Sequence, residues 1–314
     1  MQPDTTTGTP LLQRWVVWWP QALQRLAAKL AGLACFMADS RACRSAVVPL
    51  VRDALGVSSW RAHVIAAQAC INSFEYAIDS ATILAGNPRT VERINQSKNR
   101  VEGLANLEAA AARGKGVFVT ASMFSCFYYA MMCRWPAFSN GTETPRFHIV
   151  IPRRDKLLLS ICERVAQFGE RCHDFIPMDS PRAGLDVLNA IRSGGVVVCM
   201  IDNIPANAAV VPVDFFGRPA CMPAGYLMIA AKYGVPIVNC TTTCRGGVFE
   251  TRFEEPISAD ASPADADALP WLAERVHASL ERCVRANPGG WHSWDSLAVK
   301  WGVGQSLQTS GDTT

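Results

Sequence analysis

Apolar residues from position 116 onward fall into short continuous runs that alternate with helical patterns. The continuous runs lie at residues 116–121, 148–151, 174–177, 196–201 and 236–240. Helical spacing is found at residues 156–169, 182–193, 223–233 and 269–286. Continuously apolar strands between helices indicate a largely parallel sheet that is buried on both faces. We therefore predict an α/β fold with a mostly parallel central sheet flanked by helices, and ligands at the carboxyl ends of its strands.

The N-terminal third of the chain is predicted to be helical, with helices continuing at residues 61–84 and 104–113. Tryptophans and then apolar residues at helical spacing occupy Trp15, Trp18, Trp19, Leu23, Leu26, Leu30, Leu33 and Met37. Residues 11–61 carry seven basic and two acidic side chains. Tryptophans at an apolar–polar boundary with basic neighbours favour a helical element on an anionic membrane surface. The alternative is a helix that packs on the main domain with its basic face in water.

The predicted organisation is a single domain with polar tails. Small polar residues dominate residues 1–10 and 303–314, which predicts two disordered tails. Residues 11–302 are expected to form one α/β domain, in which residues 11–60 supply the interfacial helices. A secretory signal and a conventional transmembrane helix are not expected, because the start lacks a basic segment and no apolar run reaches 18 residues.

Composition narrows the function classes. The chain has 314 residues, of which 49% are hydrophobic and 18% charged, so it can bury a large core and is not generally disordered. A net charge of +3 excludes a nucleic-acid binder that works by bulk charge, and we expect no nucleic-acid partner. The twelve cysteines include no C-x-x-C pair, so their spacing predicts reduced thiols and no metal site. Cys199, within an apolar run, is expected to be a small buried hydrophobe.

Three blocks of sequence resemble one family. They are residues 194–203 (GGVVVCMIDN), 211–220 (VPVDFFGRPA) and 224–238 (AGYLMIAAKYGVPIV), with a looser match at Asn287-Pro288, Trp291 and Trp294. These blocks are similar to the lipid A late acyltransferases, the lauroyl/myristoyl transferases within the lysophospholipid acyltransferase superfamily. The resemblance covers about residues 12–301. It implies fatty acyl transfer from acyl carrier protein or coenzyme A, with the thioester as co-substrate and no other cofactor. It also implies a cytoplasmic, peripheral location at the inner face of a bacterial membrane.

The chain departs from this family at its catalytic motif. Family members carry H-x-x-x-x-D/E directly after the first core strand, where the histidine is the general base and the carboxylate fixes its tautomer. Ser122 and Phe127 stand at those two positions, and none of the five histidines has a carboxylate five residues later. The family's arginine before a proline is also replaced, by Ile151. Arg153 and Arg154 follow that proline and can clamp a phosphate or a carrier's phosphopantetheine arm; alternatively they lie at a solvated helix start.

A covalent route is one way to replace the missing base. Cys126 is expected about one turn into a helix that begins near Ser122, and a helix N-terminus lowers a thiol's pKa. Ser122 and Ser125 would then steady the oxyanion, with His148 and His173 as candidate bases on strands of the same sheet. The alternatives are that Cys126 is a buried packing residue and that the two histidines are ordinary strand-end residues.

Two further pairs of residues are candidate substrate-binding sites. Asp202 and Asn203 end a buried strand beside the expected pocket. Gly217 and Arg218 form a turn that carries a fixed positive charge, and the matching family turn lies near the substrate's charged groups. The alternative for Gly217 and Arg218 is a plain hairpin turn.

Two functions follow from these observations. The first is transfer of a fatty acyl group to an atypical amine, hydroxyl or thiol acceptor in lipid or specialised-metabolite biosynthesis, without the His/acid dyad. An amine acceptor depends less on a base, because its free form already attacks. The second is a catalytically silent acyl-binding protein or partner subunit of the same fold. A thiol-dependent hydrolase is disfavoured because the chain has no G-x-S-x-G motif.

Overall fold

The computed structural model describes residues 19–85, 99–122, 124, 145–151, 156–166, 173–202, 204, 208–245, 248–262 and 267–302. The predicted tails and residues 11–18 lie outside this range. The helices are α2 (Gln21–Met37), α3 (Val47–Leu55), α4 (Ser59–Ala85), α6 (Leu104–Ala111), α8 (Lys156–Ala166), α9 (Ala183–Arg192), α10 (Gly225–Tyr233) and α11 (Ala268–Ala286), with 3-10 turns η1 (Ser40–Ala42), η2 (Ala259–Ala261) and η3 (Pro288–Gly290). The strands are β1 (Asn99–Glu102), β2 (Val117–Ala121), β3 (Phe147–Ile151), β4 (His173–Pro177), β5 (Val196–Met200), β6 (Val210–Asp214), β7 (Pro219–Pro223), β8 (Ile237–Arg245) and β9 (Val248–Phe253).

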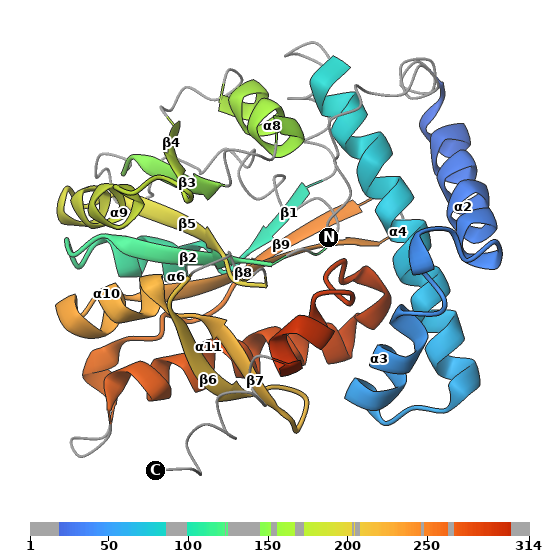
Figure 1. The fold of residues 1–314 in the computed structure, drawn as a ribbon. Coiled ribbons are helices and arrows are strands. Elements are labelled where there is room, and N and C mark those ends of the chain that lie inside the picture. The colour runs from blue at the N-terminus through green and yellow to red at the C-terminus, as the bar shows by residue number, and fades with distance from the viewer. Residues whose placement is uncertain are drawn as a thin grey trace.

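Among the described residues, seven strands form the central sheet in the order β1-β9-β8-β2-β5-β3-β4 (Figure 1). The five strands from β8 to β4 run parallel to one another, while β9 is antiparallel to β8. These five are the strands that the continuous apolar runs predict, and the α/β prediction is confirmed. The sequence pattern missed the short polar edge strand β1 and the alternating strand β9 beside it, and it missed the proline-bearing hairpin β6–β7.

Helices cover both faces of the sheet, and alternate strand residues point into two separate cores. Phe118 and Val197 belong to one cluster, together with buried residues of α9, α10 and α11. Val119 and Val198 belong to the other, together with buried residues of α6, α8 and the end of α4. Both faces are therefore closed, which leaves the strand ends as the places where a ligand can reach the sheet.

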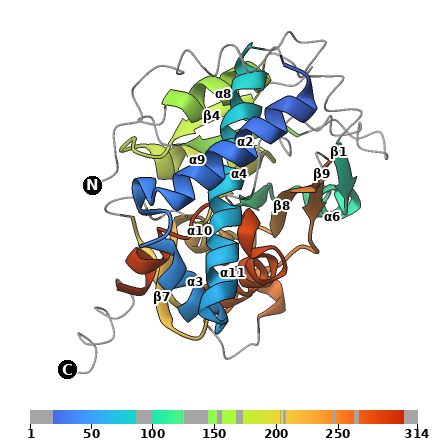
Figure 2. The ribbon, with the colours of Figure 1, turned by 90° about the vertical axis from the view of Figure 1, so that its right-hand side faces the viewer.

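Helix α2 packs across α4 (Figure 2). Its buried side chains include the polar Gln24 and the small Ala28. The Arg25 guanidinium binds both carboxylate oxygens of Asp79, at 2.7 and 3.1 Å. A side chain on Gly32 would meet the Cα of Ile71 at 2.5 Å, so the backbones approach closely there. The sequence-based alternative with the basic face in water therefore does not hold for Arg25, which is largely buried against α4.

The leucines of α2 point the other way. Side chains are 46–64% exposed at Leu23, Leu26, Leu30, Leu33 and Met37, which together we call the apolar face of α2. A surface helix of a water-soluble protein normally shows the opposite arrangement, with its apolar stripe turned to the core. None of the helices in the described part of the chain combines the length and the hydropathy that crossing a bilayer requires.

Candidate functional site at the carboxyl edge of the sheet

Two predicted site residues lie on neighbouring strands at the carboxyl edge of the sheet. Ser122 directly follows β2 and is 3% exposed. Strand β5 runs parallel to β2, with Ala121 opposite Met200, and Asp202 lies two residues beyond that pair. The structure therefore brings Ser122 and Asp202 to the same edge, as the parallel-strand argument predicts.

The Asp202 carboxylate is fully buried and accepts hydrogen bonds from the protein itself. One of its oxygens accepts from the Trp291 indole at 3.0 Å and from the Ser293 hydroxyl at 3.2 Å. The Asp202 backbone carbonyl accepts from the Lys300 ammonium at 2.5 Å and from the Ser296 hydroxyl at 3.3 Å. The hydrogen bonds of Asp202 thus hold the segment after α11 against the carboxyl end of β5.

Lys300 is a buried charge that the sequence pattern did not reveal. Burial lowers the pKa of its ammonium to about 8, against the opposing attraction of Asp202 and Asp295. Its nitrogen lies 5.8 Å from the centre of the Trp291 ring. Its partner Asp202 is 98 positions away in the chain, and no spacing rule connects residues so far apart.

An aromatic cluster packs beside Asp202 at the carboxyl edge. Phe215 and Phe216 pack on Trp291 and Trp294, with ring centres of the contacting pairs 4.5–6.4 Å apart. Phe216 has a φ of 57°, and its backbone N–H donates to a Glu281 carboxylate oxygen at 2.8 Å. The two sequence blocks with these aromatics therefore meet in one core beside Asp202.

Arg218 and Gly217 lie in the turn that joins β6 to β7, as the hairpin alternative predicts. Gly217 has a φ of 69°, which suits glycine. The Arg218 guanidinium lies 3.3 Å from the Asp53 carboxylate of α3 and 4.5 Å from the ring centre of Trp301. Its side chain is 42% exposed, so it has two protein partners and still reaches solvent.

His148 and His173 lie near the amino ends of β3 and β4, whereas Ser122 lies at the carboxyl end of β2. In the register, Phe147 pairs with His173, and His148 is level with Phe118 through β5. Ser122 is four positions after Phe118, which is about 13 Å along a strand. Burial lowers the pKa of His148, while Asp174, 3.6 Å away, raises it. The structure does not bring the two histidines together with Ser122.

The other predicted site residues lie outside the described part of the chain. They are Ser125, Cys126, Arg153, Arg154 and Asn203.

A different histidine, His292, does lie at the carboxyl edge. A backbone bridge pairs Phe124 with Trp291, the residue before His292. The Ser73 hydroxyl donates to the Ala69 carbonyl at 3.0 Å and lies 3.3 Å from His292 Nδ1. Because that hydroxyl proton is used, Nδ1 carries the donated hydrogen and Nε2 keeps its lone pair. His292 Nε2 is buried and has no hydrogen-bond partner among the described residues.

His292 also lines a pocket of about 200 Å³ between α4 and the segment after α11. Cys43, Cys70, Ser73 and Trp291 contribute to the same lining. Burial lowers the pKa of His292 to about 4, so its imidazole is neutral at physiological pH. The family motif joins residues five positions apart, whereas Ser73, the partner of His292, lies 219 positions away from it in the chain.

The mostly parallel sheet and its polar carboxyl edge define an α/β fold, the class in which ligands generally bind at the carboxyl ends of the strands. Residues 174–295 match the family described as bacterial lipid A biosynthesis acyltransferase. The chain is also 26% identical over 197 residues to a phosphatidylinositol mannoside acyltransferase of Mycobacterium tuberculosis. That match covers 61% of this chain and 57% of the relative, so the chain spans little more than half of the relative's length. The resemblance to the lipid A acyltransferases is thereby confirmed over residues 174–295.

Proposed function

We propose that the protein is a peripheral membrane acyltransferase that moves a fatty acyl group from an acyl thioester to a lipid-type acceptor. The observation that carries this proposal is the family match over residues 174–295. That segment contains Asp202, the Phe215–Arg218 turn and Trp291, which meet at the carboxyl edge. Acyl carrier protein and coenzyme A are the donor carriers implied by the resemblance. The acceptor is an amine, hydroxyl or thiol whose attack does not need the family's His/acid dyad.

The general base is the part that Ser122 does not supply. We propose His292 for this role, because its Nε2 lone pair is unused within the described residues and its ring lines a pocket beside Trp291, whose indole donates to Asp202. Loss of a general base costs on the order of 10² to 10⁴ in rate, so a replacement matters most for a hydroxyl acceptor. A pKa of about 4 keeps the imidazole neutral but makes it a weak base, which favours an amine acceptor.

The apolar face of α2 supports a location on a lipid surface. Its five side chains are about half exposed, and Trp19 beside them is 46% exposed. Lys29 lies on the same helix and is exposed, so its ammonium group is available to bind anionic headgroups. The inner face of a bacterial membrane is the location that the resemblance implies, since acyl thioesters are cytoplasmic donors there.

A silent acyl-binding protein, or a partner subunit of an active enzyme, is the second candidate. Ser122 at the family's histidine position favours it, because a scaffold has no need of the base. The fold provides an apolar, helix-covered sheet in both cases, and fold alone does not decide between them.

Intact-mass measurement with a panel of acyl thioesters, followed by addition of acceptors, separates these cases. Direct transfer gives no adduct on the protein but an acylated acceptor. A Cys126 intermediate gives an adduct of one acyl group that disappears in Cys126→Ala. Retention of the donor with neither adduct nor product, across amine, hydroxyl and thiol acceptors, would contradict the proposed enzyme and favour the binding protein.

A further inference from the structure

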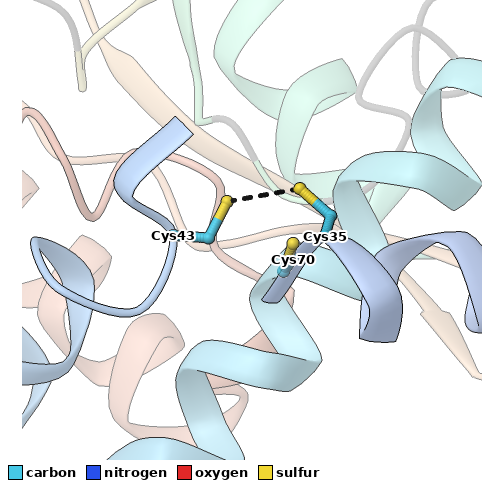
Figure 3. A group of neighbouring side chains, drawn as sticks. All are labelled: Cys35, Cys43 and Cys70. Carbon is cyan, nitrogen blue, oxygen red and sulfur yellow. Dashed lines mark hydrogen bonds between the residues drawn. The ribbon is translucent and has the colours of Figure 1, made fainter. Parts of the chain in front are cut away.

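Three cysteines from different elements of the N-terminal helical part meet at one point (Figure 3). Cys35 lies near the end of α2, Cys43 follows η1, and Cys70 lies in the middle of α4. Their Sγ atoms all lie within 4.8 Å of one another. The Sγ atoms of Cys35 and Cys43 are 3.9 Å apart.

We propose that Cys35, Cys43 and Cys70 form a three-thiolate site for one thiophilic metal ion, with Zn²⁺ as the probe. A tetrahedral zinc ion with Zn–S bonds of about 2.3 Å holds its sulfurs about 3.8 Å apart. The observed spacing needs only small side-chain adjustments to reach that geometry. Thiolate donors select soft or borderline ions such as Zn²⁺ and Cu⁺ over Mg²⁺ or Ca²⁺.

The fourth coordination position has room. Cys43 and Cys70 line the pocket of about 200 Å³ described above, which is large enough for a water molecule. Zinc sites with three protein ligands keep such an open position for water or a small ligand. The site thus borders the pocket on one side and the hydrophobic core, to which Cys70 belongs, on the other.

Binding exchanges protons for the metal without oxidation or reduction. Each thiol loses its proton as its sulfur–metal bond forms, so three protons are released for each Zn²⁺ bound. Because the thiols must be deprotonated to bind the metal, affinity is expected to rise with pH.

The proposed ion would join three segments that the chain separates. Cys35 carries the end of α2, which bears the apolar face, while Cys70 belongs to the long helix α4. The Arg25–Asp79 ion pair ties the first part of α2 to α4, and the metal would tie the last part. This proposal stands independently of the proposed acyl transfer.

Zinc titration of the reduced, metal-depleted full chain tests the proposal. We expect one zinc per chain by elemental analysis, and a thiolate-to-metal charge-transfer band when Co²⁺ replaces it. Cys35→Ser and Cys43→Ser should each weaken zinc binding by more than about 100-fold, since loss of a ligand exceeds the usual effect of an outer partner. The matched control is Cys283→Ser, a half-buried cysteine outside the cluster, which should bind zinc like the wild type.

Alkylation of the wild-type chain gives a second readout that does not depend on variants folding. Zinc should protect Cys35, Cys43 and Cys70 from maleimide while leaving the rate at Cys283 unchanged, as peptide mass spectrometry would show. Absence of zinc binding, equal protection of Cys283, or a Cys35–Cys43 disulfide that persists in a cytoplasm-like glutathione buffer would each overturn the proposal.

Discussion

Replacing Leu26 and Leu30 with glutamine perturbs the centre of the apolar face of α2. The two side chains are 51% and 60% exposed, so a membrane can cover roughly half of each. Full burial of a leucine is worth about 2 kcal/mol, so covering half contributes about 1.1 kcal/mol for each side chain. The double variant should therefore lose at least about 2.2 kcal/mol of membrane binding free energy, which is about 40-fold in the partition coefficient.

Co-sedimentation with phosphatidylglycerol-containing vesicles measures this partition coefficient. Leu185→Gln is the matched control, because Leu185 is 49% exposed on α9, away from α2. The control should bind vesicles like the wild type, and all three proteins should unfold at the same denaturant concentration. Equal vesicle binding by the double variant and the wild type would refute the reasoning, as would an equal loss in the Leu185→Gln control.

Three more outcomes are expected. Asp79→Asn should lower the free energy of unfolding by about 3–5 kcal/mol, measured by denaturant titration, because it leaves the Arg25 charge largely buried without its partner; a loss below about 1 kcal/mol would contradict that view. The free energy of unfolding should fall as pH drops from 6.5 toward 4. His277 and His292, with pKa values lowered to about 4, stay neutral in the folded protein but take up a proton on unfolding, so each can lower the free energy of unfolding by about 3 kcal/mol. Thermal unfolding measured over this pH range tests this prediction. With a hydroxyl acceptor, His292→Gln should lower the acyl-transfer kcat by about 10² or more with little change in KM, and an unchanged kcat with that acceptor would remove His292 as the base.

The parallel core of the sheet could be predicted from sequence because its strands are continuously apolar. Val196–Met200 is an example, since burial on both faces removes every polar position from the pattern. Strand β9 (Val248–Phe253), between β8 and the edge strand β1, has alternating burial, and β1 (Asn99–Glu102) is short and polar, so neither stands out from a loop. Local pattern therefore identifies continuously apolar strands better than alternating or short polar ones.

The orientation of α2 is a second feature that periodicity alone does not fix. Its leucine stripe was evident in the sequence, but which stripe faces α4 depends on contacts with distant residues. Arg25 finds Asp79 54 positions away, and Gly32 allows Ile71 to approach. These two contacts turn the polar face inward and leave the leucines outside.

The candidate site was predicted in part for the same reason. Asp202 was expected at the carboxyl edge because strand ends are visible in the sequence. Its partners Trp291 and Lys300, and the meeting of Ser73 with His292, join positions that only the fold brings together. The three clustered thiols likewise follow no short spacing motif, because the packing of α2, η1 and α4 brings them together.

Transfer of a labelled acyl group on vesicles tests the central claim most directly. Full-length protein would be incubated with labelled acyl carrier protein or acyl coenzyme A and vesicles that contain a bacterial lipid extract or phosphatidylinositol mannoside. The account predicts a labelled, newly acylated lipid whose formation needs the vesicles and falls at least about 100-fold in His292→Gln if the acceptor is a hydroxyl. Donor that stays bound and intact, with no acylated lipid from any acceptor, would contradict it.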